Sequence, residues 1–363
     1  MFKGHPMSYR NLLSKTKGLI LIFFIFVFGL EVYSESINAQ PDVQRYKSIL
    51  DKNPEDIKVR KALANLYFNQ KMWKQCENFL VAYKEDLDRN SIFQLAKCQH
   101  EQKKYSEEVK TLLTLSPDKK KDLKALYYIG LAYADSNQYP NAITYYKKAL
   151  QVDGESRVVY EHLLDVFEKT KNIYEQRVLL KEMIKKFESV APYYHKLCRT
   201  YSEEAFVAET IKICSTAIEK DQKHAAESYV YLAQAYIDSK QKDKAKKILK
   251  TATKRFKGSE VVFRTMGEFF LNEKDFHSAL RYFKTAFRNN DHSARSALGM
   301  AKSLFYTGKF EEAYGAFEKA CRLDRSTYTD FRTATSRLQQ EKKYDLHNKY
   351  LKASNRCRMT QLK

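Results

Sequence analysis

The sequence has few residues that interrupt helices. Among its 363 residues there are only 10 Gly and 6 Pro. Gly and Pro are the strongest markers of turns and loops, so their scarcity indicates a chain that is mostly helical. The length also exceeds that of one ordinary compact domain.

The sequence also lacks the short motifs of the common catalytic classes. It has no phosphate-binding loop, no Gly-rich dinucleotide turn, and no HExxH or GxSxG motif. Its eight histidines are scattered, and its acidic residues are dispersed, so no carboxylate pair for acid–base work emerges. We therefore predict no enzyme activity, no catalytic residue and no cofactor.

The nearest approach to a metal site involves His195, which precedes Cys198 by three residues, and Cys214 on the following helix. Three such ligands could begin a zinc site. Both cysteines, however, fall in packing columns of the repeat described below, where cysteine serves as a small hydrophobe. We therefore predict no metal site.

The six cysteines raise the question of disulfides. Cys198 and Cys214 face each other across a predicted hairpin, and they form the candidate pair. The other four have no evident partner in the sequence: Cys76, Cys98, Cys321 and Cys357.

Only one long apolar run occurs, from Gly18 to Leu30, and four basic residues precede it. A basic start, 13 apolar residues and small residues beyond them resemble a secretory signal peptide. We expect cleavage after Ser34, with Ala39 as a second choice, and a periplasmic or secreted product. The alternative is an uncleaved membrane anchor at residues 18–30. In both cases the positive flank places the residues after about 35 on the far side of the membrane.

Acidic residues are too few to balance the basic ones. Without residues 1–34 the chain has 61 Lys and Arg against 43 Asp and Glu, a formal charge of +18. Such a charge favours loose association with anionic surfaces: nucleic acid, lipid headgroups or acidic envelope polymers. Nucleic acid is the least available of these to an exported chain. Solvated lysines on helix faces would give the same composition.

The chain contains an internal repeat of about 34 residues. The segments beginning at Ile129, Met266 and Met300 place small and large residues in the same order. One column, always preceded by an apolar residue, recurs nine times at steps of 32 to 35 residues: Ala64, Ala96, Gly130, Leu164, Cys198, Ala233, Gly267, Ala301 and Thr335. Glu108, Leu164 and Gln176 are bulky residues in columns that are otherwise small.

Within each repeat the apolar residues recur with helical periodicity on both sides of a short polar break, which predicts a helical hairpin. We expect the small column to be where the paired helices cross closely, and a bulky residue at Gly130 to cost about 1–3 kcal/mol. The predicted segments are a linker at 35–41, a half-repeat at 42–55, a basic tail at 355–363, and repeats at about 57–84, 89–116, 123–153, 157–187, 191–221, 226–256, 260–290, 294–324 and 328–354.

These residues resemble the tetratricopeptide repeat family, and the resemblance covers residues 42–354. It implies an all-α, right-handed superhelical solenoid of antiparallel hairpins, whose concave groove binds a protein or peptide partner. By resemblance, the groove is lined by first-helix residues that point away from the second helix: Lys61, Asn65, Tyr127, Leu131, Asp165, His195, Arg199, Arg264, Glu268, Lys302 and Arg332.

Some family members clamp a peptide carboxylate with Lys and Asn one helical turn apart. Lys61 and Asn65 resemble the first half of such a clamp, but Lys97 stands where a second Asn is expected. The sequence therefore predicts an exported, non-catalytic scaffold that holds a shaped protein partner. The alternatives are a membrane-anchored envelope assembly factor and a binder of anionic polymer or lipid.

Overall fold

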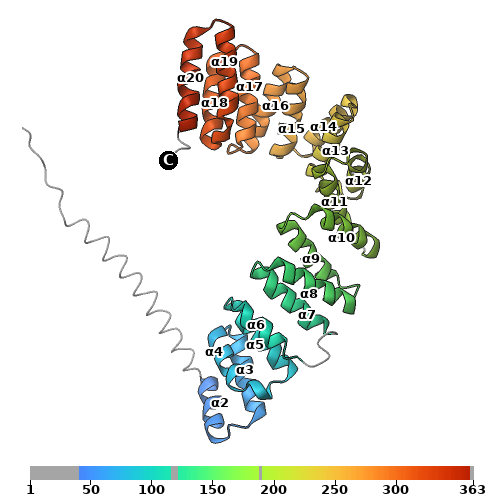
Figure 1. The fold of residues 1–363 in the computed structure, drawn as a ribbon, viewed down its shortest axis with the longest axis vertical. Coiled ribbons are helices and arrows are strands. Elements are labelled where there is room, and N and C mark those ends of the chain that lie inside the picture. The colour runs from blue at the N-terminus through green and yellow to red at the C-terminus, as the bar shows by residue number, and fades with distance from the viewer. Residues whose placement is uncertain (1–40, 116–121, 188–189, 360–363) are drawn as a thin grey trace, which may run out of the picture. The chain divides into compact units, whose positions relative to one another are not determined.

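The computed structural model describes residues 41–115, 122–187 and 190–359. These residues form nineteen α-helices and no strand, as the sequence predicts (Figure 1). The helices are α2 (Pro41–Lys52), α3 (Ile57–Asn69), α4 (Trp73–Ala82), α5 (Arg89–Glu101), α6 (Tyr105–Leu112), α7 (Leu123–Asp135), α8 (Tyr139–Val152), α9 (Arg157–Lys169), α10 (Ile173–Lys186), α11 (Ala191–Glu203), α12 (Val207–Lys220), α13 (Ala226–Asp238), α14 (Lys242–Arg255), α15 (Glu260–Asn272), α16 (Phe276–Asn289), α17 (Ala294–Tyr306), α18 (Phe310–Leu323), α19 (Tyr328–Gln340) and α20 (Tyr344–Met359).

From α3 onward the helices alternate as the first and second members of hairpins. The predicted signal segment, residues 1–34, and the linker up to residue 40 lie outside the described residues, whereas Pro41, the last residue of the predicted linker, begins α2. Among the helices that are described, none is long and apolar enough to cross a membrane.

The chain divides into two compact units, and the division falls inside α9. Unit 1 comprises the described residues up to Val166, and unit 2 those from Phe167 onward. Each unit is a series of stacked hairpins with its own buried apolar clusters.

The small column is where the two helices of a hairpin cross. A Cβ atom added to Gly130 would lie 2.7 Å from the ring of Tyr146, and one added to Gly267 would lie 2.9 Å from the ring of Phe283. The aromatic partner stands sixteen residues after the glycine in both hairpins, and both rings are buried. The close crossing predicted from the sequence is therefore confirmed.

Two polar residues occupy positions where other repeats carry alanine, and both are buried. The Gln176 side chain donates through Nε2 to the carbonyl oxygen of Phe167 at 2.9 Å. The Glu108 carboxylate faces His100, with Oε2 2.9 Å from Nδ1. A buried polar group is tolerated only when it has such a partner.

The turn inside each hairpin uses a left-handed residue at one fixed position, seven residues after the small column. Six of the nine are lysines: Lys71, Lys103, Lys171, Lys240, Lys274 and Lys342. Asn137, Ala205 and Gly308 fill the other three hairpins. Glycine normally favours this conformation. The chain thus forms nine tight turns with little glycine, and the strained residue marks each repeat independently of the apolar pattern.

All six cysteines are paired in the structure. Cys198 and Cys214 join α11 to α12 with a Cα–Cα distance of 4.9 Å. Two further bonds join different hairpins: Cys76 of α4 to Cys98 of α5 at 6.3 Å, and Cys321 of α18 to Cys357 of α20 at 6.0 Å. These distances suit a disulfide. The partners of these four cysteines are not evident from the sequence, because the pairs form between stacked hairpins.

The final helix is longer than predicted. It continues to Met359, past the expected end of the repeats at Ser354, so most of the predicted tail at 355–363 is helical. Cys357 explains the extension, since it is buried and bonded to Cys321.

Candidate functional site

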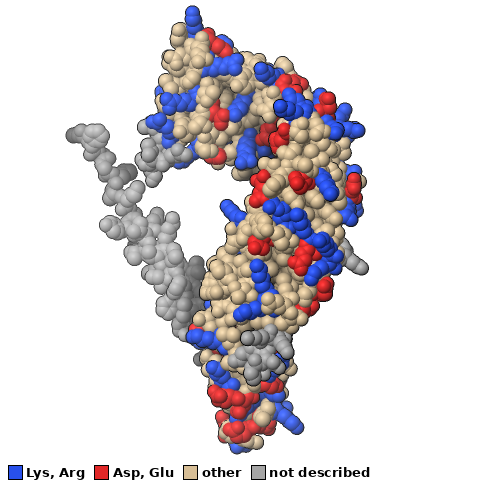
Figure 2. All heavy atoms as spheres, turned by 45° about the vertical axis from the view of Figure 1, so that its right-hand side comes forward, with Lys and Arg blue, Asp and Glu red and all other residues tan. Residues whose placement is uncertain are grey.

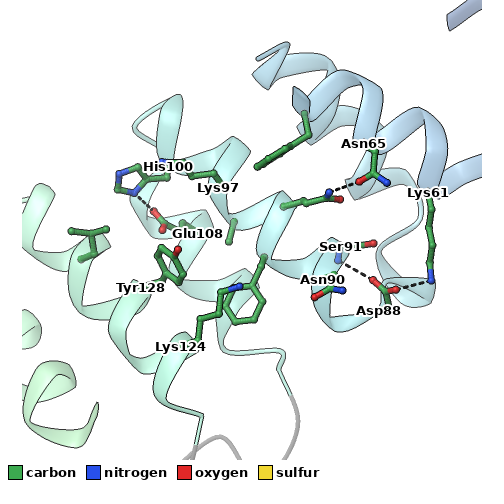
Figure 3. Close-up of a pocket in the computed structure, with 15 residues that line it drawn as sticks. Lys61, Asn65, Asp88, Asn90, Ser91, Lys97, His100, Glu108, Lys124 and Tyr128 are labelled. Carbon is green, nitrogen blue, oxygen red and sulfur yellow. Dashed lines mark hydrogen bonds and ion pairs between the residues drawn. The ribbon is translucent and has the colours of Figure 1, made fainter. Parts of the chain in front are cut away.

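The first helices of unit 1 line a hollow with a volume of about 660 Å³. Its walls come from α3, α5 and α7, with one residue from α6 (Figure 3). Three kinds of side chain surround it: the cations Lys61, Lys97 and Lys124, the amides Asn65, Asn90 and Gln94, and the aromatic rings Phe68, Phe93 and Tyr128.

One end of the hollow is built on the start of α5. Asp88 caps this helix by accepting a hydrogen bond from the Ser91 backbone N–H at 2.9 Å. Its other oxygen lies 2.6 Å from Lys61 Nζ, and this contact lowers the pKa of Asp88 to about 2. The capping carboxylate therefore stays ionised at all ordinary pH values and positions the Lys61 ammonium at the rim.

Amide and aromatic groups form the middle of the hollow. Gln94 donates through Nε2 to Asn65 Oδ1 at 2.5 Å, which links α5 to α3 across the floor. The Lys124 ammonium lies 4.2 Å from the centre of the Phe93 ring. The centres of the Phe93 and Tyr128 rings are 5.9 Å apart. Amides can pair with a peptide backbone, and the rings can contact an apolar side chain.

The other end holds the buried acid–base pair. His100 Nδ1 faces Glu108 (Figure 3), and its Nε2 lies 3.4 Å from Asp135 Oδ2. Burial raises the pKa of Glu108, and the hydrogen bond that His100 donates to the Glu108 carboxylate raises the pKa of His100. Both shifts favour protonation, so the pair holds its proton more firmly than the separate groups would.

Glu108 and His100, which both line the hollow, are hydrogen-bonded to each other. Within the described ranges, no cluster of His, Cys, Asp or Glu could hold a metal ion. His195, considered above as a zinc ligand, instead contacts Ser228 Oγ at 2.8 Å, and its two cysteine neighbours are bonded to each other.

Three of the predicted groove residues of unit 1 line the hollow: Lys61, Asn65 and Leu131. Tyr127 does not, because its hydroxyl lies 2.9 Å from His162 Nε2 between two hairpins. The next residue, Tyr128, takes the predicted place. Asp165 is exposed on α9.

The predicted groove cations of unit 2 are mostly held in ion pairs. Arg199 lies 2.9 Å from Glu168, and Lys302 lies 2.6 Å from Asp330. Arg264 bridges Glu260 and Glu268 at 3.1 and 2.8 Å. Arg332 is exposed on α19. Lys302 also lines a second hollow of about 660 Å³, where the rings of Phe276 and Tyr306 stack at 4.7 Å.

Sequence reasoning missed several residues of the unit 1 hollow, chiefly Asp88, Phe93, His100, Lys124 and the carboxylate of Glu108. Glu108 was recognised only as a residue too large for its column. A charged residue in a packing column is a usable signal, because burying it requires a partner nearby.

Comparison with known proteins identifies the repeats. Three stretches match sequence profiles described as tetratricopeptide repeat: residues 123–156, 226–257 and 266–326. The chain therefore contains tetratricopeptide repeats. Superkiller protein 3 of Schizosaccharomyces pombe is 26% identical over 245 residues, which is 62% of this chain. The match spans only 17% of the length of that relative.

One solved structure supports the fold. The C-terminal part of a TPR repeat-containing protein from Cytophaga hutchinsonii superposes with a TM-score of 0.53 and 15% identity, covering 65% of this chain and 98% of that one. Pseudomonas aeruginosa pilF gives a TM-score of 0.47 and 17% identity, covering 58% and 96%. At 15% identity, the likeness to the Cytophaga hutchinsonii structure concerns the fold alone.

Proposed function

We propose that this protein is a non-catalytic scaffold that holds an extended segment of a partner protein in the hollow of unit 1, called the unit 1 groove below. The chain contains tetratricopeptide repeats, which fit a protein-interaction role. The hollow across α3, α5 and α7 carries this proposal. Its amides can meet the backbone of a peptide, while Phe93 and Tyr128 contact an apolar side chain. Lys124, whose ammonium lies against Phe93, is placed to meet an acidic residue.

The lining argues against the two-carboxylate clamp that some relatives use. Lys97 occupies the position of the second clamp asparagine and lies 2.6 Å from Glu101. Lys61 is held by Asp88. The groove therefore suits an internal peptide segment with alternating apolar and acidic residues better than a free C-terminal carboxylate.

We further propose that the protein acts outside the cytoplasm, in a periplasmic or secreted state. The six cysteines support this, since they are buried or half-buried and pair completely, and disulfides persist in oxidising compartments. Residues 1–34 serve as the cleaved signal peptide in this proposal. A retained anchor at residues 18–30 would give the membrane-bound assembly factor, and N-terminal sequencing of the cell-made protein separates the two.

The groove assignment is tested by crosslinking in the producing cells, followed by mass spectrometry, with the protein as bait. The triple variant Asn65→Ala, Gln94→Ala, Lys124→Gln should lose the specific partner. A matched variant on the outer face of the same unit should keep it: Lys74→Gln, Lys110→Gln, Lys147→Gln, all at exposed positions. A partner that survives the groove variant binds elsewhere, and the proposal fails.

A further inference from the structure

The outer sides of α14 and α16 carry six cations at equivalent positions. Lys247, Lys250 and Lys254 lie on α14, and Arg281, Lys284 and Arg288 follow on α16, each 34 residues later. The spacing of three and then four residues places each trio on one side of its helix. All six side chains are exposed. Figure 2 shows Lys and Arg side chains along the visible face of unit 2.

These six cations lie on helices that carry little acidic charge, with Asp243 of α14 as the one carboxylate in the two helices. Among the described residues, none of the six forms an ion pair with a carboxylate, and α16 itself contains no Asp or Glu. On α20, two of the three cations at equivalent positions are paired with carboxylates of α18, Lys349 with Glu311 and Arg356 with Glu318. The unbalanced charge is therefore concentrated on α14 and α16.

Helix stability explains only part of this pattern. A cation in the last turn of a helix is favoured by the helix dipole, which accounts for Lys254 and Arg288. Lys247, Lys250, Arg281 and Lys284 lie further inside their helices. Like charges one turn apart repel each other, so an isolated helix would be more stable without them.

We propose that the outer faces of α14 and α16 form a docking surface for a linear polyanion, a polymer whose carboxylate or phosphate groups recur along its chain. The cations are about 4.5–6 Å apart along each helix axis, so one flexible chain can meet several of them at once. Binding of this kind gains its free energy from released counterions and needs no shaped pocket.

The surroundings favour a polymer over a folded protein or a bilayer. A protein interface is built around buried aromatic or apolar anchors, and a surface-bound helix inserts an apolar face between lipids. The exposed large apolar side chains of the described residues include none on α14 or α16. The surface also lies on second helices, apart from the residues proposed to hold a protein segment, so either assignment can fail alone.

The test measures binding of the purified protein to fluorescent alginate, which carries carboxylates, and to polyphosphate, at several salt concentrations. We expect the variant Lys247→Gln, Lys250→Gln, Lys254→Gln to bind at least about tenfold more weakly at about 0.1 M salt, with a shallower salt dependence. The variant Arg281→Gln, Lys284→Gln, Arg288→Gln should behave alike. The polymer for which these variants lose more affinity identifies the anionic group, carboxylate or phosphate.

The control variant Lys74→Gln, Lys110→Gln, Lys147→Gln removes the same charge from unit 1 and should change affinity less than about twofold. If the control variant loses as much affinity as the α14 and α16 variants, the effect comes from net charge alone, and the proposal is overturned. Absence of binding to both polymers, or binding only to vesicles containing phosphatidylglycerol, would overturn it as well. Circular dichroism confirms that each variant is folded.

Discussion

Unit 1 and unit 2 are built from the same helical hairpin, but they carry their charge in different places. Residues 41–166 contain 21 Lys and Arg against 18 Asp and Glu, whereas residues 167–363 contain 40 against 24. In unit 1, charged groups line the groove and one carboxylate is buried beneath it. In unit 2, the predicted groove cations are mostly paired, and six exposed cations without an ion pair lie on α14 and α16.

The comparison shows which residues the fold leaves free. The crossing pairs, such as Gly130 with Tyr146 and Gly267 with Phe283, have the same geometry in both units. Most of what distinguishes the units lies outside these columns. The exceptions are Glu108 in unit 1, and Gln176 and the Cys198–Cys214 bond in unit 2. Function is therefore expected on residues that vary between repeats.

The two units can be followed separately in solution. Trp73 is the only tryptophan of the chain and lies in α4, so its fluorescence follows the unfolding of unit 1. Circular dichroism follows the helices of both units.

The largest expected effect comes from the disulfides, of which unit 2 has two and unit 1 has one. Each should contribute about 3 kcal/mol to the free energy of unfolding. Reduction should therefore lower the denaturant midpoint of unit 2 more than that of unit 1. The unit 1 midpoint is read from Trp73 fluorescence, and the unit 2 midpoint from the part of the circular dichroism transition that Trp73 does not follow. Six free thiols in the denatured, non-reduced protein would contradict the pairing.

Overpacking the helix crossing should come next. Gly130→Leu forces a side chain into the Tyr146 ring and should lower the free energy of unfolding of unit 1 by about 1–3 kcal/mol. Gly315 in α18 has open space around its Cβ position, so Gly315→Ala should instead stabilise unit 2 by about 0.5–1 kcal/mol. An unchanged Trp73 midpoint in Gly130→Leu would mean that the column is not a close crossing.

The two units should respond to pH in opposite directions. The pKa of His100 is raised by Glu108, so its contribution to unit 1 is present below pH 6.5 and is lost as the pH rises through the raised value. Burial lowers the pKa of His195, so its contribution to unit 2 is present above pH 6.5 and is lost as the pH falls.

Denaturant midpoints measured between about pH 5.5 and 8 check these signs. Glu108→Gln should flatten the pH dependence of the Trp73 transition, and His195→Gln that of the unit 2 transition. If the midpoints of both units change with pH in the same direction, the opposite pKa shifts of His100 and His195 are contradicted.

The smallest expected effect concerns the hairpin turns. Lys71→Gly in unit 1 and Lys342→Gly in unit 2 should each stabilise their own unit by about 0.5–1 kcal/mol, because glycine adopts positive φ without a Cβ clash. Gly308→Ala, at the same position of another hairpin, should destabilise unit 2 by a similar amount. Thermal melts of the three variants would show the order, and equal midpoints would count against strain at this position.

Much of the fold follows from the sequence, because the packing columns repeat. Once the packing of one hairpin is inferred, the same packing applies to the others. The site follows less well. Whether Tyr127 or Tyr128 faces the hollow depends on how α7 is rotated about its axis. A shift of one residue in the predicted register of the helix is enough to exchange the two. The pairing of Cys76 with Cys98 requires knowing how neighbouring hairpins stack, and the burial of Glu108 requires knowing that His100 comes to meet it.

The most direct test of the account places a photo-crosslinking residue at Gln94, in the unit 1 groove, or at Ser106, which is exposed on the first turn of α6 in the same hairpin. After irradiation of the producing cells, we predict a discrete protein adduct from position 94 and none from position 106. Equal adducts from both positions, or an adduct from position 106 alone, would contradict the claim that the groove holds the partner.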